Sequence, residues 1–311
     1  MSAAAEEDEK KEDFLMKCAS CGVVANGEDG VKLKNCACKL VKYCSVKCQK
    51  DHRKHHKNEC KKRVDELRDE IIFKQPESTH VGDCPICCLP IPIDQSKSNL
   101  YPCCCKLICQ GCNYVNQKRE YEGRLEHKCP FCREPLADTA EEFNGQMMKR
   151  IEANDPTAIS HIGTKRYHEG DYKSALEYWT KAVALGDVEA HNQLSALYGD
   201  GKGVEKDVKK EFHHLTEAAI GGDHCARYNL GTYEWKNGRV DRAVKHYIIA
   251  AKLGFDASLE RLNTLHRLGH VSKEDFEAAL RGHKAAIDAT KSPEREEAAK
   301  SCADGYERRI V

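Results

Sequence analysis

The sequence predicts a mainly α-helical protein in which two small zinc-binding modules precede an α-solenoid of helical hairpins. Two observations carry this prediction. Of the 19 cysteines, all but Cys225 and Cys302 lie between Cys18 and Cys132, so the chain has a cysteine-rich front and a cysteine-poor back. From about residue 140 onward, helix-forming sequence repeats at intervals of 36 and 32 residues, which is the period of helix-hairpin solenoids.

The composition describes a water-soluble chain without a dominant charge. Lysine plus arginine equals aspartate plus glutamate at 50 each, so the whole molecule has no field that favours nucleic acid or membrane. The acidic start lacks the apolar core of a secretory signal, and no run reaches the roughly 18 apolar residues of a transmembrane helix. We therefore expect an intracellular protein, cytoplasmic or nuclear. Thiols are kept reduced there, which favours metal sites over disulfides.

Amino-acid composition and the spacing of apolar residues and cysteines divide the chain into six segments. Low apolar content predicts disorder at the acidic start, and helical spacing followed by polar residues predicts a helix and a linker between the two cysteine clusters. The predicted boundaries are a disordered N-terminus at 1–15, a first cysteine module at 18–60, a helix and linker at 61–80, a second cysteine module at 84–135, a solenoid with a C-terminal cap at 140–290, and a charged tail at 291–311.

The first cysteine cluster supplies eight candidate ligands, enough for two tetrahedral zinc ions with none left over. They are Cys18, Cys21, Cys36, Cys38, Cys44, Cys48, His56 and Cys60. The last two lie four residues apart, which places both on one face of a helix. So short a segment cannot bury much core, so zinc has to supply its folding free energy, on the order of 10 kcal/mol per structural ion.

The stretch VKYCSVKCQKDHRKHHKNEC resembles the second half of a MYND zinc finger. Ligands interleave in that family, which implies one zinc on Cys18, Cys21, Cys44 and Cys48 and a second on Cys36, Cys38, His56 and Cys60. Two features depart from the family pattern: one residue instead of two separates the third and fourth ligands, and Arg53 replaces the tryptophan near which MYND domains bind short peptides. The resemblance thus implies zinc more strongly than peptide binding. His52 and His55 are predicted to be surface residues.

The second cluster contains three CxxC pairs, a pattern typical of zinc sites. The pairs are Cys84/Cys87, Cys109/Cys112 and Cys129/Cys132, and the run CCC at 103–105 precedes the middle one. The cluster resembles an all-cysteine RING finger, which implies that Cys84, Cys87, Cys109 and Cys112 share one zinc. Two cysteines of the CCC run would then join Cys129 and Cys132, while Cys88 breaks the spacing and is predicted to be spare.

The RING resemblance selects Cys104 from the CCC run and leaves its partner open between Cys103 and Cys105. In similar algal sequences, glycine or serine stands at the position of Cys105, and neither residue binds zinc. We therefore expect Cys103 and Cys104 to be the ligands and Cys105 to be spare. Adjacent side chains of a strand point apart, so the chain must turn here, and Pro102 is the expected place.

RING fingers that act as ubiquitin ligases hold a ubiquitin-conjugating enzyme in a reactive orientation and do no covalent chemistry themselves. Three residues match the positions that make these contacts in the family. Ile86 and Pro130 match the apolar docking positions, and Arg133 matches an arginine that bridges to ubiquitin. The alternative is a structural RING that only pairs with other proteins.

The back half contains three aligned segments, KAVALGDVEA, EAAIGGDHCA and IAAKLGFDAS. Their glycines, Gly186, Gly222 and Gly254, stand where a helix needs a left-handed residue to end. The segments resemble Sel-1-like repeats in three units, 158–189, 190–225 and 226–257, followed by a cap. Such solenoids bind proteins along a concave surface. We expect His213 and His214 to lie on the helix surface, and no pattern here indicates catalysis.

Together these resemblances imply two cross-braced zinc fingers, holding about four Zn²⁺ ions, in front of a Sel-1-like solenoid. This order of modules is similar to that of a set of algal proteins. The leading interpretation is a RING-type ubiquitin ligase, without a catalytic residue of its own, that recruits its substrate or peptide ligand through the repeats. The alternative is a non-enzymatic adaptor. A third interpretation, a nuclear regulator touching nucleic acid through the basic MYND face, is opposed by the zero net charge.

Overall fold

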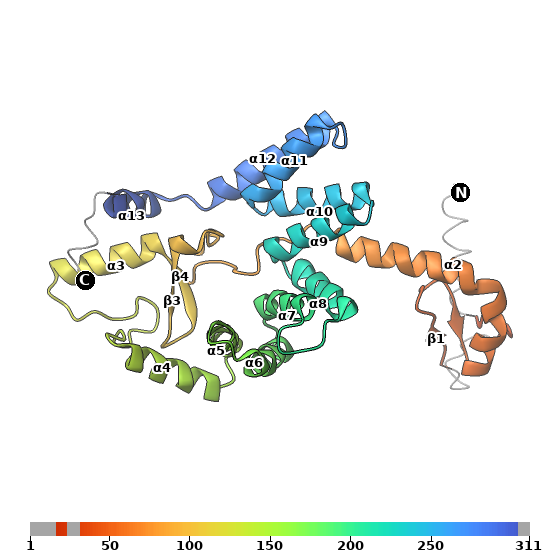
Figure 1. Cartoon of the computed structure of the whole chain (residues 1–311), viewed down its shortest axis with the longest axis horizontal. Coiled ribbons are helices and arrows are strands. Elements are labelled where there is room, and N and C mark those ends of the chain that lie inside the picture. The colour runs from red at the N-terminus through yellow and green to blue at the C-terminus, as the bar shows by residue number, and fades with distance from the viewer. Residues whose placement is uncertain (1–16, 24–31, 304–311) are drawn as a thin grey trace. The chain divides into compact units, whose positions relative to one another are not determined.

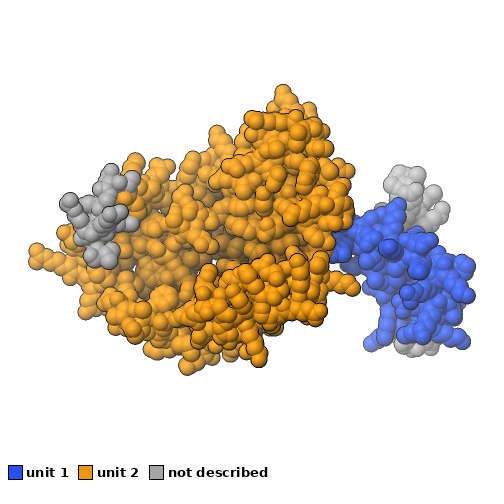
Figure 2. Space-filling model, in the orientation of Figure 1, with its two compact units in different colours: residues 1–74 blue, residues 75–311 orange. Residues whose placement is uncertain are grey.

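The computed structural model describes residues 17–23 and 32–303 and divides the chain into two compact units. The first comprises residues 1–74 and the second residues 75–311 (Figure 2). The N-terminal segment 1–15, predicted to be disordered, lies outside the described residues. The segments predicted as a second cysteine module at 84–135 and a solenoid at 140–290 both lie in the second unit.

The described part of the first unit contains a small antiparallel ladder and one long helix. Strand β1 (Lys34–Asn35) pairs with β2 (Lys42–Tyr43), and α2 (Val46–Ile72) follows. The side chain of Ser45 caps α2 by accepting a hydrogen bond from the Cys48 N–H at 3.2 Å. Neither glycine nor proline interrupts α2, so the helix predicted after residue 60 is a continuation of the one that carries the last ligands.

The second unit begins with a hairpin and continues as helices (Figure 1). Strand β3 (Ser98–Tyr101) pairs antiparallel with β4 (Lys106–Cys109), so that Tyr101 lies opposite Lys106. The remaining elements are η1 (Gln95–Lys97), α3 (Gln110–Glu122), α4 (Ala140–Glu152), α5 (Pro156–His168), α6 (Tyr172–Ala184), α7 (Val188–Asp200), α8 (Val208–Ile220), α9 (His224–Lys236), α10 (Val240–Lys252), α11 (Asp256–Arg267), α12 (Lys273–Ala289) and α13 (Pro293–Ala303). Among the described helices, none combines the length and the apolar character needed to cross a membrane.

The helical hairpins of the second unit start and stop at residues that the repeats share. Helices α5 to α9 each begin after an aspartate whose side chain accepts a hydrogen bond from a backbone N–H of the first turn. The hairpins pair α5 with α6, α7 with α8 and α9 with α10. Gly186, Gly222 and Gly254 follow the helix ends with φ between 91° and 96°, which confirms the predicted left-handed positions.

Small residues let the paired helices approach closely. A Cβ at Gly163 of α5 would lie 2.7 Å from the indole ring of Trp179 in α6, so only glycine fits against that ring. Trp179 is fully buried, and its Nε1–H donates a hydrogen bond to the Ser160 carbonyl at 3.1 Å. The tryptophan therefore fills the space between the two helices without leaving its polar atom unpaired.

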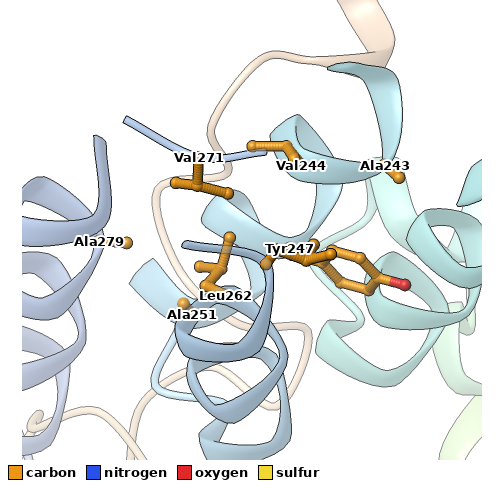
Figure 3. Packing of buried hydrophobic residues seen from close by; sticks show 8 residues of the cluster. Ala243, Val244, Tyr247, Ala251, Leu262, Val271 and Ala279 are labelled. Atoms are coloured by element: carbon orange, nitrogen blue, oxygen red, sulfur yellow. The ribbon is translucent and has the colours of Figure 1, made fainter. Parts of the chain in front are cut away.

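The C-terminal end of the solenoid is closed by a cluster of buried apolar residues. Ala243, Tyr247 and Ala251 of α10 pack against Leu262 and Leu265 of α11 (Figure 3). Ala279 of α12 and Val271 complete the cluster. Helices α11 and α12 thus occupy the place predicted for a cap, covering the apolar face that the last repeat would otherwise expose.

The end of the predicted linker and the start of the predicted charged tail make contacts within the second unit. The charged tail begins with α13, which packs against α3 of the second cysteine module (Figure 1). The polar linker is held at its end as well, since the His80 N–H donates a hydrogen bond to the Gly222 carbonyl at 3.2 Å. Long-range contacts therefore hold both segments, which composition alone did not indicate.

Candidate metal centres

The first unit gathers its ligands at the two ends of its small ladder. Cys18, Cys21, Cys44 and Cys48 form one group, in which the Sγ of Cys44 lies 3.6 Å from those of both Cys21 and Cys48. The ligand Cys44 directly follows β2, and Cys48 lies in the first turn of α2. The Ser45 cap that starts the helix therefore also sets the spacing of these two thiols.

A second group in the first unit joins Cys36 and Cys38 to two residues of α2. The Sγ of Cys36 lies 3.4 Å from that of Cys60, and the Sγ of Cys38 lies 3.1 Å from Nε2 of His56. His56 is buried, with 4% of its surface exposed, and Glu59 approaches its Nδ1 at 3.4 Å. A carboxylate on the second ring nitrogen is a common way to orient a zinc-binding histidine.

The second cysteine module also forms two groups, and they interleave. One contains Cys84, Cys87, Cys109 and Cys112, and the other contains Cys103, Cys104, Cys129 and Cys132. The Cys87–Cys109 and Cys104–Cys129 sulfur distances are both 3.8 Å, and the Cys103–Cys132 distance is 3.3 Å. Strand β4 and the start of α3 carry the middle pair, so the hairpin spaces one group from the other.

The two other cysteines of this module, Cys88 and Cys105, lie outside both groups. Cys105 is buried beside Met147 of α4, its Sγ 3.9 Å from the Met147 Sδ. The chain turns at this point, where the N–H of Cys105 donates to the Tyr101 carbonyl and Cys105 has φ of 52°. The structure thus places Cys103 and Cys104 in the metal group and Cys105 in the packing against the helices. Cys88 is exposed and outside both groups.

The spacing of these side chains fits zinc. A Zn–S bond of about 2.3 Å implies sulfurs about 3.8 Å apart along the edge of a tetrahedron. The sulfur–sulfur distances given above range from 3.3 to 3.8 Å, and within each group every ligand atom lies within 4.8 Å of the others. Thiolate and imidazole are the donors of closed structural zinc sites, so all four groups suit a structural ion.

Hydrogen bonds from the surrounding protein lower the pKa of some thiols, which favours the thiolate form that binds a cation. Burial raises the pKa of Cys18, but backbone N–H groups of Cys21 and Cys44 outweigh it and bring the pKa to about 6. A hydrogen bond from the Cys109 thiol, together with nearby backbone N–H groups, lowers the pKa of Cys84 to about 4 against the effect of burial. Each thiolate opposes ionisation of its neighbours, so four thiolates in one group need a central cation.

Arg295 of α13 reaches the second cysteine module from the far end of the chain. Its Nη2 donates a hydrogen bond to the Cys87 Sγ at 3.4 Å and its Nη1 donates to the Pro90 carbonyl at 2.7 Å. A cation beside a zinc-bound thiolate stabilises the negative charge of the site. Sequence reasoning missed this residue, because it lies 208 positions from Cys87 in a segment that only looked charged.

The three residues proposed to contact a conjugating enzyme are placed differently from one another. Ile86 has 41% of its surface exposed, whereas Pro130 is half-buried. The Arg133 guanidinium donates a hydrogen bond to the Asn116 side-chain oxygen at 3.0 Å and pairs with the buried Glu120 at 3.4 Å. Arg133 is therefore engaged within its own module.

Two of the histidines predicted to lie on the surface are partly buried. His52 accepts or donates a hydrogen bond with the Tyr43 hydroxyl at 3.0 Å and stacks on His56. His214 stacks on Tyr198, and its Nδ1 lies 3.0 Å from that of His191. Burial and the neighbouring His191 lower the pKa of His214 to about 4. His55 and His213 are exposed, as predicted.

Comparison with known proteins identifies two kinds of module. Residues 18–60 match the MYND finger family, and residues 160–187, 188–223 and 226–255 match the Sel1 repeat family. The chain therefore contains a MYND finger followed by Sel1 repeats. The matches confirm the predicted first module and place the repeats within two residues of the predicted units.

Individual relatives share parts of the chain. The chain is 28% identical over 149 residues to the chitin synthase regulator SKT5 of Saccharomyces cerevisiae, covering 43% of this chain and 21% of that protein. It is 39% identical over 56 residues to HcpC of Helicobacter pylori, covering 18% of this chain and 19% of that protein. The matches thus span about a fifth of the length of these curated relatives.

Among solved structures, a Sel1 repeat protein from Oxalobacter formigenes is similar to this chain. The two are 24% identical, with a TM-score of 0.43 over 58% of this chain and 72% of that one.

Proposed function

We propose that this protein is a non-enzymatic adaptor that binds other proteins through its MYND finger and its Sel1 repeats. The observation that supports this most is the separation of the two modules: the finger lies in the unit 1–74 and the repeats in the unit 75–311. Two modules in different units can hold two partners on one chain. The name of the yeast relative, a chitin synthase regulator, agrees with a regulatory role.

The repeats offer apolar side chains for such contacts. Leu185 at the end of α6, Val208 at the start of α8 and Ile220 at its end are 42%, 48% and 36% exposed. Isolated exposed apolar residues are ordinary, but residues of this kind supply the anchors of protein interfaces. The second cysteine module lines a cavity together with the starts of α5 and α7, so this part of the repeat surface is already partly occupied.

The adaptor function is tested by disabling one module at a time in the full chain. Cys44→Ser removes a ligand of the first finger, and Val208→Asp places a charge on the exposed repeat surface. Proteins captured by the wild type and cross-linked to it are then compared with those captured by each variant. Lys209→Asp, which changes charge beside Val208 without removing an apolar contact, is the matched control.

We expect each variant to lose a different partner, and both partners to occur in one complex with the wild type. If the two variants lose the same protein, or neither loses any, the two modules do not act as separate binding sites.

A RING-type ubiquitin ligase is the second candidate. We infer a RING-type finger at 84–132 from the interleaved cysteine groups, and the exposed Ile86 and Phe131 favour docking of a conjugating enzyme. Two observations rank it lower. Arg133 is held by Glu120, and Phe131 lines a cavity of about 620 Å³ whose other wall includes Val188 at the start of α7. The helices thus crowd part of the surface that a conjugating enzyme would need.

Autoubiquitination with a panel of conjugating enzymes separates the two candidates. A ligase forms ubiquitin chains, and Ile86→Ala abolishes them while the zinc content stays the same. Leu125→Ala, at a position that is 52% exposed in the same module, is the control and should leave chain formation unchanged. A zinc-loaded wild type that is inactive with every enzyme leaves the adaptor as the function.

A further inference from the structure

Three potential metal ligands come together outside the four cysteine-rich groups. They are His80, Asp223 and His224, whose candidate ligand atoms all lie within 4.8 Å of one another. His80 lies in the segment before the second cysteine module, and the other two lie at the start of α9. The sequence therefore separates by more than a hundred residues the side chains that the fold brings into one group.

The backbone brings His80 to this place through Gly222. The His80 N–H donates a hydrogen bond to the Gly222 carbonyl at 3.2 Å. Gly222 has φ of +91°, and a Cβ there would lie 2.7 Å from the carbonyl oxygen of Ser78. A side chain at this position would push residues 78–80 away, so the approach of His80 to α9 depends on glycine.

Each of the three side chains has capacity to bind an ion. Asp223 and His224 are 2% and 8% exposed, and the Nδ1 atoms of both His80 and His224 are buried without a hydrogen-bond partner in the described structure. The two imidazole rings stack with centroids 6.0 Å apart. A buried polar atom without a partner is unfavourable, so two such nitrogens side by side point to a ligand between them.

The surroundings supply negative charge. The group lines a cavity of about 540 Å³ that is also lined by Asp187 and Glu189. The start of α9 carries the partial positive charge of a helix N-terminus, which opposes a cation. Three carboxyl groups face this cavity and outweigh that partial charge. Asp223 uses one oxygen to cap α9, accepting from the Ala226 N–H at 2.8 Å.

We propose that His80, Asp223 and His224 form a fifth metal site, for a divalent transition ion such as Zn²⁺. Two imidazoles and one carboxylate are a common donor set for such ions, and a water molecule would complete four-coordination. The ion fastens residues 78–80 to the turn between α8 and α9. It thereby ties the segment that enters the second cysteine module to the solenoid.

The preceding repeat supplies a matched variant. The pair Asp187–Val188 at the start of α7 occupies the position that corresponds to Asp223–His224 at the start of α9. Asp187 caps its helix in the same way as Asp223. A Sel1 repeat therefore forms this helix start with valine in place of histidine. His224→Val should fold, while removing one ligand of the proposed site.

The test is the zinc content of the full chain, purified under reducing conditions and equilibrated with Zn²⁺. We expect five ions per chain in the wild type and four in His224→Val. His80→Ala removes the ligand that lies outside α9, and this variant should also hold four ions. It replaces His224→Val in the test if that variant folds poorly. His213→Ala, in which an exposed histidine is lost, is the control and should keep five.

If the wild type holds four ions, the proposed site is wrong. It is also wrong if the wild type and all variants hold the same number of ions. Backbone hydrogen exchange over residues 76–83 gives a second readout. Added Zn²⁺ should slow this exchange in the wild type and leave it unchanged in His224→Val. Equal exchange with and without Zn²⁺ in the wild type would also count against the proposal.

Discussion

The two cysteine modules have the same interleaved arrangement of ligands but different support. Among the described residues of the first module, the buried cluster is Cys18, Cys36, Cys38, Val41 and Tyr43, of which three are candidate ligands. The cluster of the second module also contains Ile91, Tyr101 and Ile108, and residues outside the module support it.

Those outside contacts come from both ends of the helical region. Met147 of α4 packs on Cys105, and Arg295 of α13 hydrogen-bonds to Cys87 and Pro90. In the described part of the chain, the ligands of the first module are thus supported by that module's own short core, whereas those of the second are also supported by contacts from α4 and α13. The two modules should therefore respond differently to loss of metal.

The largest expected effect is that of strong chelation. Removing zinc should unfold residues 18–60 completely, since each structural ion supplies on the order of 10 kcal/mol and the module has little other core. The second module should lose order around its ligands, while the solenoid keeps its helical circular dichroism. Hydrogen exchange resolved by residue measures both. Equal protection of the two modules after chelation would contradict the comparison.

Single serine replacements in the CCC run sharpen the assignment of ligands. Cys103→Ser and Cys104→Ser should each release one zinc ion, because serine does not bind it. Cys105→Ser should release none and should lower the melting temperature slightly, since it places a hydroxyl against Met147. Elemental analysis and thermal melting distinguish the two outcomes. Loss of zinc from Cys105→Ser but not from Cys103→Ser would reverse the assignment.

A pair of valine substitutions separates the effect of backbone strain from the effect of losing the contact with residues 78–80. Gly222 and Gly186 both have φ of about +91°, where a β-branched residue costs at least about 1 kcal/mol. An added Cβ at Gly222 would strike the Ser78 backbone, whereas at Gly186 it would meet nothing within 4 Å. We expect Gly222→Val to lose more stability than Gly186→Val in urea unfolding. Equal losses would show that residues 78–80 contribute little to the second unit.

The smallest effect is expected from Arg295→Ala. It removes hydrogen bonds to Cys87, Pro90 and Leu89, which should destabilise the second module by about 1–3 kcal/mol and leave the first unchanged. The rate of zinc transfer to a competing chelator, followed with a metallochromic dye, measures this. Arg281→Ala, whose side chain is 71% exposed, is the matched control. Faster release in both variants would mean that the effect is not specific.

Patterns local in sequence predicted much of this structure. The resemblance to a MYND finger implied groups such as Cys18–Cys21 with Cys44–Cys48, and the repeat pattern located the helix ends at Gly186, Gly222 and Gly254. Local patterns did not reveal Arg295 or His80, whose partners lie 208 and more than a hundred positions away. A charged tail and a polar linker have the same composition whether or not they dock, so only the fold identifies these contacts.

The packing of α13 on α3 has a consequence for the order in which the protein matures during synthesis. The ribosome makes α13 after every other described helix, so Arg295 can reach Cys87 only after the whole solenoid has been synthesised. The first module has all of its ligands by residue 60 and can take up zinc while later residues are still being added. The second module reaches its final state only after α13 has been made, which leaves its thiols open to competing metals and oxidants for longer.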